Sequence, residues 1–283
     1  MKKIAFILSL FIFCLFLDTI LFAQTTESFS YDGITELTVK GRYAKVIIDG
    51  QNGNQLTFKG EITGSGNDEI KYEKNGNSLK VWLEVNGNSW GNKKATLDFK
   101  VPKGIELVVD NSSGGVSASN LDGPKIELLA SSGSIYAENI SSGLILKTSS
   151  GGIKAKEITG DINAKSSSGG QHLDNIVGNI KAVATSGGVK VSNVKGSLNI
   201  SNSSGGISGD EVMLTQSSSF KTSSGGIKMD FVNDLDDLSF ECSASSGNIK
   251  IGEESSGKKI ILKYGDIMIH GVSSSGSQKY STK

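Results

Sequence analysis

The side chains that most often carry catalysis are few and scattered in this sequence. His172 and His270 are the only histidines, and Arg42 is the only arginine. Glycoside hydrolysis needs two carboxyl groups held a fixed distance apart, and elimination on uronic acids needs a basic side chain beside acidic groups. No carboxylate in the middle of the chain recurs at one point of successive repeats with a lysine or histidine beside it. These single carboxylates are Glu138, Glu157, Asp161, Asp174 and Asp210.

Serine is the one potential nucleophile that recurs, in tetrads such as Ser149-Ser150-Gly151-Gly152. A serine nucleophile needs a neighbouring base, and no base occurs in phase with the tetrads. The sequence contains neither a His-Glu-x-x-His zinc motif nor a phosphate-binding loop. We therefore expect no catalytic residue, no cofactor-binding residue, no metal ligand and no enzymatic activity. The serines are instead typical of turns whose hydroxyls bond nearby backbone.

The beginning of the chain predicts a secretory signal peptide over residues 1–23. Two lysines precede an apolar run over residues 4–22, and the small residue Ala23 follows it. The run is about 20 residues long, enough to cross a bilayer, so an uncleaved anchor helix is the alternative. Asp18 interrupts the run and favours cleavage before Gln24. We expect an exported protein in the periplasm, on the outer surface or outside the cell, whose mature chain has no integral membrane segment.

The amino-acid composition limits which partners and which fold class the chain can have. The chain has 29 basic and 29 acidic residues, so no net positive charge is available to hold nucleic acid. Cys242 is the only cysteine beyond the signal peptide, so the mature chain can form no internal disulfide. The 36 glycines and 2 prolines suit strands joined by tight turns. No helical periodicity is sustained beyond the signal peptide, so the chain is predicted to be all-β.

An internal repeat organises the rest of the sequence. The first glycine of successive tetrads falls at 114, 133, 151, 169, 187, 205, 225 and 247, at intervals of 19, 18, 18, 18, 18, 20 and 22. Apolar residues alternate with polar ones between the tetrads, which is the period of a strand. A second turn in most units is marked by Gly123, Gly143, Gly160, Gly178 and Gly196.

Equivalent positions of the repeat carry similar residues. Two positions after the first glycine, the column reads Val116, Ile135, Ile153, Gln171, Val189, Ile207, Ile227 and Ile249. Stacked units would place these residues above one another around a shared interior. We therefore predict a parallel β-helix, or β-solenoid, with coils of about 18 residues, right-handed by expectation. Gln171 is the polar exception, and it either points outward through a bulge or has its amide satisfied internally.

The repeat suggests a division of the chain. We expect a signal peptide over 1–23, a strand-rich N-terminal cap over 24–110, solenoid repeats over 111–272 and a polar, mobile tail over 273–283. The cap holds both tryptophans, which serve either its core or a ligand face. An aspartate cluster in the last units predicts a solvated loop, with a cation site as the alternative. It comprises Asp230, Asp234, Asp236 and Asp237.

The stretch Leu97-Asp98-Phe99-Lys100-Val101-Pro102-Lys103-Gly104, with Ile105-Glu106-Leu107-Val108-Val109-Asp110 after it, leads into the recurrent SSGG-I-x-A pattern. In this layout the chain resembles the bacterial putative-adhesin family, domains of unknown function with β-strand repeats, and the related head-GIN-type putative autotransporter adhesins. The resemblance covers most of the mature chain. It implies a secreted β-solenoid and suggests binding, and it supplies no catalytic residues.

Taken together, the sequence predicts a secreted or cell-envelope β-solenoid that acts as an adhesin or as a structural interaction module. Its expected partners are glycans or proteins of the envelope or of a host surface, without nucleic acid and without a cofactor. Two alternatives remain open. One is a polysaccharide-processing enzyme, because many β-helices belong to that class. The other is an accessory protein of the envelope stress response.

Overall fold

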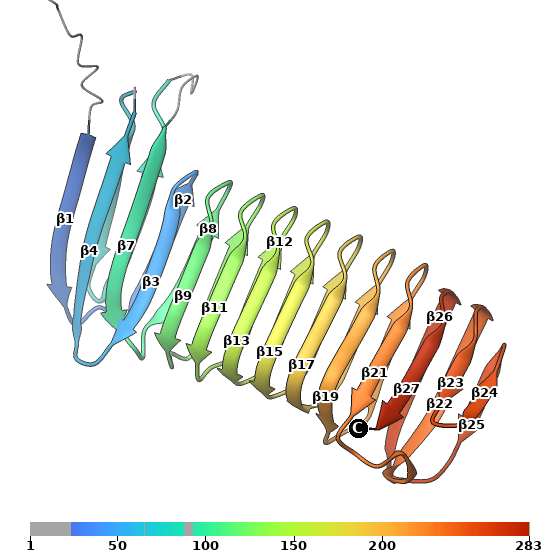
Figure 1. The fold of residues 1–283 in the computed structure, drawn as a ribbon. Coiled ribbons are helices and arrows are strands. Elements are labelled where there is room, and N and C mark those ends of the chain that lie inside the picture. Colours follow the sequence, from blue (N-terminus) through green and yellow to red (C-terminus); the bar gives the residue numbers. More distant parts are fainter. Residues whose placement is uncertain (1–23, 65, 88–92, 283) are drawn as a thin grey trace, which may run out of the picture.

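In the computed structural model, described for residues 24–64, 66–87 and 93–282, the chain forms one long rod of stacked strands (Figure 1). The strands belong to two sheets of fourteen and thirteen strands, which we call sheet A and sheet B. No helix within the described ranges is long and apolar enough to cross a membrane. The predicted signal peptide lies outside the described residues. The all-β solenoid prediction is confirmed.

The spatial order of the strands differs from their order in the chain near both ends of the rod. Sheet A contains, in spatial order, β1 (Gln24–Asp32), β4 (Gln55–Thr63), β7 (Lys94–Pro102), β3 (Lys45–Gln51), β9 (Val116–Leu121), β11 (Ile135–Ile140), β13 (Ile153–Thr159), β15 (Gln171–Val177), β17 (Val189–Gly196), β19 (Ile207–Leu214), β21 (Ile227–Phe231), β27 (Gln278–Thr282), β23 (Ile249–Ile251) and β24 (Glu254–Ser256). Sheet B contains β25 (Lys259–Leu262), β22 (Leu238–Ser246), β26 (Ile267–Ser275), β20 (Ser218–Thr222), β18 (Leu198–Asn202), β16 (Ile180–Ala184), β14 (Ile162–Ser166), β12 (Leu144–Thr148), β10 (Ile126–Ala130), β8 (Glu106–Asn111), β2 (Glu36–Arg42), β6 (Ser78–Glu84) and β5 (Glu69–Asn75). A short 3-10 turn, η1, spans Leu235–Asp237.

Each regular coil is one sheet B strand, a serine-glycine turn and one sheet A strand. Neighbouring coils pair in parallel and in register, so Ile153 lies beside Gln171, Gln171 beside Val189 and Val189 beside Ile207. This column is the one that the repeat predicts. Its members are all buried, and each fully buried aliphatic side chain contributes about 1.5–3 kcal/mol of transfer free energy. Burial between the sheets therefore holds the coils together without any disulfide.

Two coils lie out of chain order, one near each end of the rod. The coil of β2 and β3 stacks between β6–β7 and β8–β9. The coil of β26 and β27 stacks between β20–β21 and β22–β23. At the C-terminal end the chain runs outward to β22–β25 and then returns to insert β26 and β27. At the N-terminal end it leaves the β2–β3 coil, forms the outer strands β4–β7 and then passes back across that coil to β8. Residues 36–51, which the repeat pattern suggested as part of a cap, thus form a coil of the rod.

Antiparallel strands finish both ends. β4 and then β1 pair beyond β7, and β5 pairs beyond β6. At the other end β24 and β25, with three and four residues, pair beyond β23 and β22. Short antiparallel edges limit further strand addition. The ring centroids of Phe29 and Phe58 lie 4.7 Å apart, and those of Phe29 and Tyr72 lie 4.5 Å apart, so aromatic side chains pack together between the terminal strands.

The prediction of a mobile tail from Ser273 onward is wrong for residues 273–282. This segment completes β26 and forms β27, which pairs with β21 and β23. The Tyr280 side chain is completely buried, and its hydroxyl donates to Gln278 Oε1 over 2.9 Å. The Gln278 amide donates to Ser243 O and Ser273 Oγ. The segment looks polar because its buried amide and hydroxyl satisfy one another inside the core.

Gln171 takes the second of its two expected positions, inside the core. Its side chain is 2 % exposed, and Nε2 donates to Ser166 Oγ over 3.0 Å and to Val183 O over 2.8 Å. Its Oε1 atom is buried without a hydrogen-bond donor among the described residues. Gln278 has the same arrangement with Ser273, but there Tyr280 supplies the missing donor, whereas the coil of Gln171 has Leu173 at that place.

The unbonded Gln171 oxygen predicts that substitutions at this site can increase the stability of the protein. The double variant Ser166→Ala, Gln171→Val copies the Ala184 and Val189 pair of the next coil and removes the orphaned oxygen. We expect it to raise the free energy of unfolding by about 1–2 kcal/mol, measured by urea denaturation. The matched variant Ser273→Ala, Gln278→Val should destabilise, because it leaves the buried Tyr280 hydroxyl without its acceptor. Equal effects of the two pairs would contradict this explanation.

Candidate functional site

The serine-glycine turns stack into one continuous edge of the rod, which we call the serine edge. It consists of the exposed serine or threonine pairs at 112–113, 131–132, 149–150, 167–168, 185–186, 203–204, 223–224, 274–275 and 245–246. The turns are bonded to one another through backbone. The amide of Ser150 donates to Ser131 O, and the amide of Ser168 donates to Ser149 O, both over 2.8 Å. The hydroxyls therefore project from a rigid, evenly spaced backbone.

The first glycine of each tetrad makes this stacking possible. A methyl group on Gly169 would lie 1.9 Å from the carbonyl oxygen of Gly151, whereas one on Gly170 would lie 3.4 Å from its nearest neighbour, Gly188 O. The same contact recurs from coil to coil, with 2.0 Å for Gly151 against Gly133 O. Gly247 in the last tetrad has a φ of 134°, whereas Gly133, Gly151, Gly169 and Gly170 have no positive φ. Close approach of successive backbones, and not the turn conformation, therefore requires glycine there.

A buried polar residue supports several of these turns from below. Thr148 Oγ1 donates to Gly133 O over 3.2 Å and accepts from the amide of Gly151 over 3.1 Å. Asn202 serves two neighbouring turns in the same way. The sequence signal is a Thr or Asn immediately before the tetrad, and the prediction from the repeat did not include it. These side chains bond their turns to the previous coil, so they stiffen parts of the serine edge.

Two adjoining hollows follow the serine edge on its sheet B side. The first has a volume of about 330 Å³ and is lined by Ser131, Ser149, Ser167, Lys147 and Lys165, among others. The second has a volume of about 180 Å³. Its lining consists of Lys40, Arg42, Trp82, Leu83, Asp110 and Ser112. Both hollows include Asp110, so they form one shallow trough between the turns and the outer face of sheet B.

The N-terminal end of the trough gathers unusual residues. Arg42 has a φ of 56°, an uncommon conformation for a side chain other than glycine or asparagine. Trp82 lies half-buried on the outer face of sheet B, with the Lys80 amine 5.2 Å from its ring centroid. Trp82 thus lies outside the core, while Trp90 lies outside the described residues. An aromatic ring and a guanidinium at one end of a hydroxyl-lined trough can stack on and bond a polar ligand.

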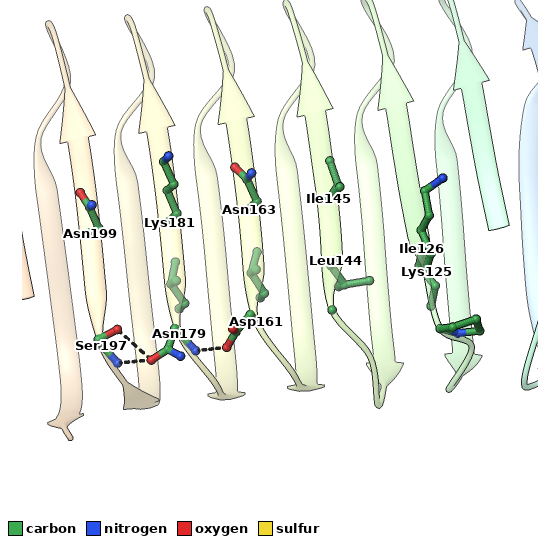
Figure 2. A pocket seen from close by; sticks show the side chains of 14 residues that line it. Lys125, Ile126, Leu144, Ile145, Asp161, Asn163, Asn179, Lys181, Ser197 and Asn199 are labelled. Atoms are coloured by element: carbon green, nitrogen blue, oxygen red, sulfur yellow. Dashed lines mark hydrogen bonds between the residues drawn. The ribbon is translucent and has the colours of Figure 1, made fainter. Parts of the chain in front are cut away.

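The opposite edge of the rod carries a different polar ladder, which Figure 2 shows beside a groove of about 470 Å³. The amide of Asn179 donates to Asp161 Oδ1 over 2.8 Å, and the amide of Ser197 donates to Asn179 Oδ1 over 3.1 Å. These side-chain oxygens are used to hold the backbone of the next coil. Asp161, Asn179 and Ser197 therefore join successive second turns along this groove.

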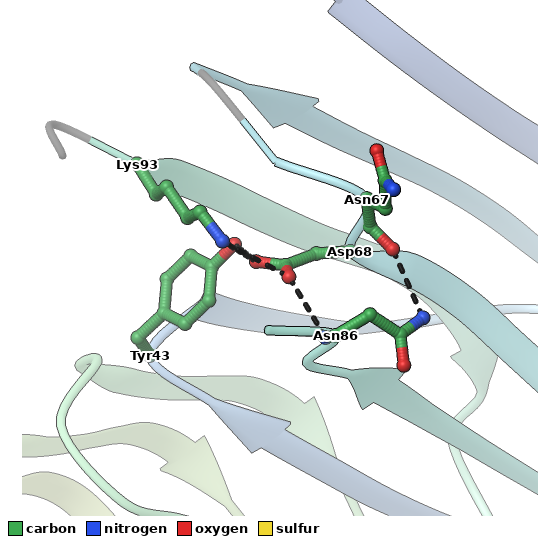
Figure 3. A network of polar contacts seen from close by, with 5 residues as sticks. All are labelled: Tyr43, Asn67, Asp68, Asn86 and Lys93. Carbon is green, nitrogen blue, oxygen red and sulfur yellow. Dashed lines mark hydrogen bonds and ion pairs between the residues drawn. The ribbon is translucent and has the colours of Figure 1, made fainter. Parts of the chain in front are cut away.

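A buried ion pair occurs near the N-terminal end (Figure 3). Asp68 accepts from the Tyr43 hydroxyl over 2.7 Å, from Lys93 Nζ over 3.0 and 3.1 Å, and from the Asn86 amide over 3.0 Å. Burial would raise the pKa of Asp68, but these hydrogen bonds outweigh burial and lower it. Burial and the neighbouring Asp68 raise the pKa of Tyr43. Tyr43 and Lys93 are both hydrogen-bonded to Asp68. This network therefore joins the segments that carry Asp68 and Lys93 to the turn between β2 and β3.

The structure places three of the five scattered carboxylates in one row of sheet A. Glu138, Asp174 and Asp210 share one outward row of sheet A, alternating with Lys156 and Ser192. Glu138 pairs with Lys156 over 3.3 Å, and Asp174 accepts from Asn193 over 3.1 Å. Among residues 24–64, 66–87 and 93–282, no three acidic, histidine or cysteine side chains form a group that could hold a metal ion.

The histidines stay apart from these carboxylates and from each other. His172 lies on the outer face of sheet A, between Lys154 and Lys190. His270 lies on sheet B, with its Nδ1 3.7 Å from Glu241 Oε2.

Comparison with known proteins gives a family match over most of the chain. The family model described as Toastrack DUF4097 matches residues 34–281. None of the curated proteins compared with the chain matches it. A solved structure described as a putative lipid binding protein from Parabacteroides distasonis is 16% identical, covers 90% of this chain and 96% of its own, and has a TM-score of 0.46.

Two other solved structures are similar to the chain. One, described as a putative adhesin from Parabacteroides merdae, is 10% identical over 73% of this chain and 95% of its own, with a TM-score of 0.43. The other, a putative adhesin from Bacteroides fragilis, is 14% identical over 92% of this chain and 97% of its own, with a TM-score of 0.36.

Proposed function

This chain belongs to the Toastrack DUF4097 family, and from that premise we propose that it is an exported, non-enzymatic binding module of the cell envelope that engages glycans through its serine edge. The observation that carries the proposal is the serine edge itself. Its serines are exposed, and the backbone turns that carry them are joined by turn-to-turn hydrogen bonds. Export rests on the predicted signal peptide over residues 1–23.

A rigid row of hydroxyls suits a repetitive ligand. Successive coils lie about 4.8 Å apart, close to the length of one sugar ring in an extended polysaccharide, so hydroxyl groups of ligand and protein can meet in step. Because the serines are already fixed, binding loses little conformational entropy. Affinity then comes from many weak contacts along one edge, which is the behaviour expected of an adhesive or scaffolding protein.

We expect a triple variant of the serine edge to lose this binding. Ser132→Leu, Ser150→Leu and Ser168→Leu replace three exposed hydroxyls on successive turns. Each lost hydrogen bond is worth about 0.5–1.5 kcal/mol, so affinity for a bound glycan should fall by about tenfold or more. The mature protein would be screened on an array of neutral and charged polysaccharides, and the variant's affinity then measured by biolayer interferometry.

The control carries the same kind of change on the opposite edge. Ser141→Leu and Thr159→Leu alter exposed second-turn residues and should leave affinity unchanged. A wild-type protein that bound no glycan on the array would refute the adhesive part of the proposal. New reducing ends or unsaturated products after incubation with the same polysaccharides would instead support the alternative of a polysaccharide-processing enzyme.

A further inference from the structure

The outer face of sheet A has a row of basic side chains directly beside the serine edge. The row is formed by the first outward residue after each tetrad, and its members lie next to one another in the parallel register. In spatial order it reads Tyr136, Lys154, His172, Lys190, Ser208, Lys228, Lys279 and Lys250. The residues come from distant parts of the sequence, and stacking alone brings them into line.

Sheet B has a second such row on the other side of the same edge. There the first outward residue before each turn reads, in neighbouring coils, Lys40, Asp110, Leu129, Lys147, Lys165, Val183, Ser201, Lys221 and Val272. Lys147 and Lys165 line the larger hollow of the trough. The serine edge is therefore bordered by lysines on both faces, although the whole chain has equal numbers of basic and acidic residues.

Most of these cations lack an ionic partner in the described part of the chain. Lys154, Lys190 and Lys279 on sheet A, and Lys165 and Lys221 on sheet B, have no carboxylate within ion-pair distance there. Lys228, Lys250 and Lys147 are paired, with Asp230, Glu253 and Glu127.

The neighbouring carboxylates of sheet A are engaged elsewhere. Glu138 pairs with Lys156, Asp174 accepts from Asn193, and Asp49 pairs with Lys100 over 2.6 Å. Glu138 and Asp230 also lie near enough to interact electrostatically with Lys154 and Lys279, so nearby negative charge neutralises only part of the row along the serine edge.

Such a row costs stability when nothing is bound. Like charges directly opposite on adjacent strands repel, and adjacent coils are only about 4.8 Å apart. In the next outward row of sheet A, opposite charges lie beside each other instead, as Glu138 and Lys156 do. The unpaired lysines Lys154, Lys190 and Lys279 recur every two to three coils along one line, and a long ligand with negative charges along its length could neutralise them together.

We propose that the serine edge and its two lysine rows bind an acidic polysaccharide lying along the rod. This inference rests on the proposed glycan-binding function and names the class of glycan. Carboxylate or sulfate groups of the polymer would meet the lysines on either side, while its hydroxyls bond the serine turns. At the N-terminal end of the sheet B trough, Trp82 offers a ring on which a sugar can stack, beside Lys40 and Arg42.

Polygalacturonate and its fully methyl-esterified form are the probes that test this inference, because they share one backbone and differ in charge. We expect the mature protein to bind polygalacturonate about tenfold or more tightly than the ester, and the difference to shrink as salt is raised. Equal affinity for the two forms would overturn the inference. It would leave the proposed function standing, because that predicts binding to a glycan without specifying its charge.

Two lysine variants locate the site. Lys154→Gln with Lys190→Gln removes two unpaired cations beside the serine edge on sheet A, and Lys165→Gln with Lys221→Gln does so on sheet B. Each pair should weaken polygalacturonate binding by about fivefold. The matched control is Lys181→Gln with Lys195→Gln, which removes the same charge from exposed lysines near the second turns and should change affinity less than about twofold.

Thermal unfolding of every variant shows whether the fold is kept, and these exposed substitutions should leave it intact or slightly stabilised. If the control pair weakens binding as much as the edge pairs, general charge attraction explains the result and the site is refuted. If single-stranded DNA competes as well as polygalacturonate at equal charge, the edge recognises any polyanion and the assignment to a polysaccharide falls. Failure to bind any glycan, neutral or acidic, would refute the proposed function as well.

Discussion

Replacing Gly169 with alanine is expected to destabilise the protein strongly, while the same change at Gly170 is tolerated. The added methyl group at Gly169 would lie 1.9 Å from Gly151 O, within a backbone contact that neither turn can release without breaking its hydrogen bonds to the next coil. Overpacking of this kind costs about 3 kcal/mol. The free energy of unfolding from urea titration at neutral pH is the measurement.

Gly170→Ala is the matched control in the same turn. Its new methyl group would lie 3.4 Å from Gly188 O, and alanine loses less backbone entropy on folding than glycine does, so the change should lie within about 1 kcal/mol of zero. If both variants lost the same free energy, turn conformation and not coil-to-coil contact would be the reason for glycine. Gly151→Ala should reproduce the larger loss, because its contact with Gly133 O is equivalent.

Asp68→Asn should have a comparably large effect through a different cause. The Asp68 side chain is 1% exposed and that of Lys93 is 8% exposed, so the substitution leaves a buried ammonium without its counter-ion. Breaking a buried pair by removing one partner costs about 3 kcal/mol or more. Asp122→Asn changes an exposed aspartate and serves as the control, with an expected loss below about 0.5 kcal/mol.

The Asp68 effect should also depend on pH. The pKa of Asp68 is lower in the folded chain than in the unfolded chain, because hydrogen bonds from Tyr43, Lys93 and Asn86 outweigh the effect of burial. Its stabilisation is therefore complete above the unfolded pKa of about 3.9, and it is lost as the pH falls through the lower folded value. The stability difference between wild type and Asp68→Asn should be constant above about pH 5 and shrink as the pH falls from there through the lowered folded pKa. A difference that stayed constant below about pH 5 would exclude the carboxylate as its source.

The stiffness that these predictions probe bears on binding. The glycine contacts and the buried Thr148 and Asn202 hydrogen bonds hold each turn against the previous one. A Gly169→Ala variant that remains folded in part should therefore also bind glycan less well, because neighbouring turns lose their common spacing. Rigidity of the serine edge links the energetics of the fold to its proposed use.

The regular coils could be predicted from the sequence because they depend on local pattern. The alternation of polar and apolar residues sets which side chains face inward, and the constant interval between tetrads sets the register. The column of Ile153, Val189 and Ile207 follows from these two facts, and its place in the structure confirms it. Gln171 could be located in that column, but its hydrogen-bond partners could not, because Val183 reaches it only through the opposite sheet.

The order of the coils at the ends of the rod, and the alignment of the lysines beside the serine edge, depend on the tertiary structure. Sequence order suggests that coils stack in the order of the chain, yet β2–β3 and β26–β27 are inserted between later or earlier coils. Long-range pairing of this kind leaves no local signal, and so the Gln278–Thr282 strand looked like a tail. The lysine rows beside the serine edge likewise exist only once segments far apart in the chain, such as those of Lys228 and Lys279, are placed side by side. Periodicity determined the repeating interior, whereas contacts between segments far apart in the chain determined how its ends close and which charged side chains lie beside the serine edge.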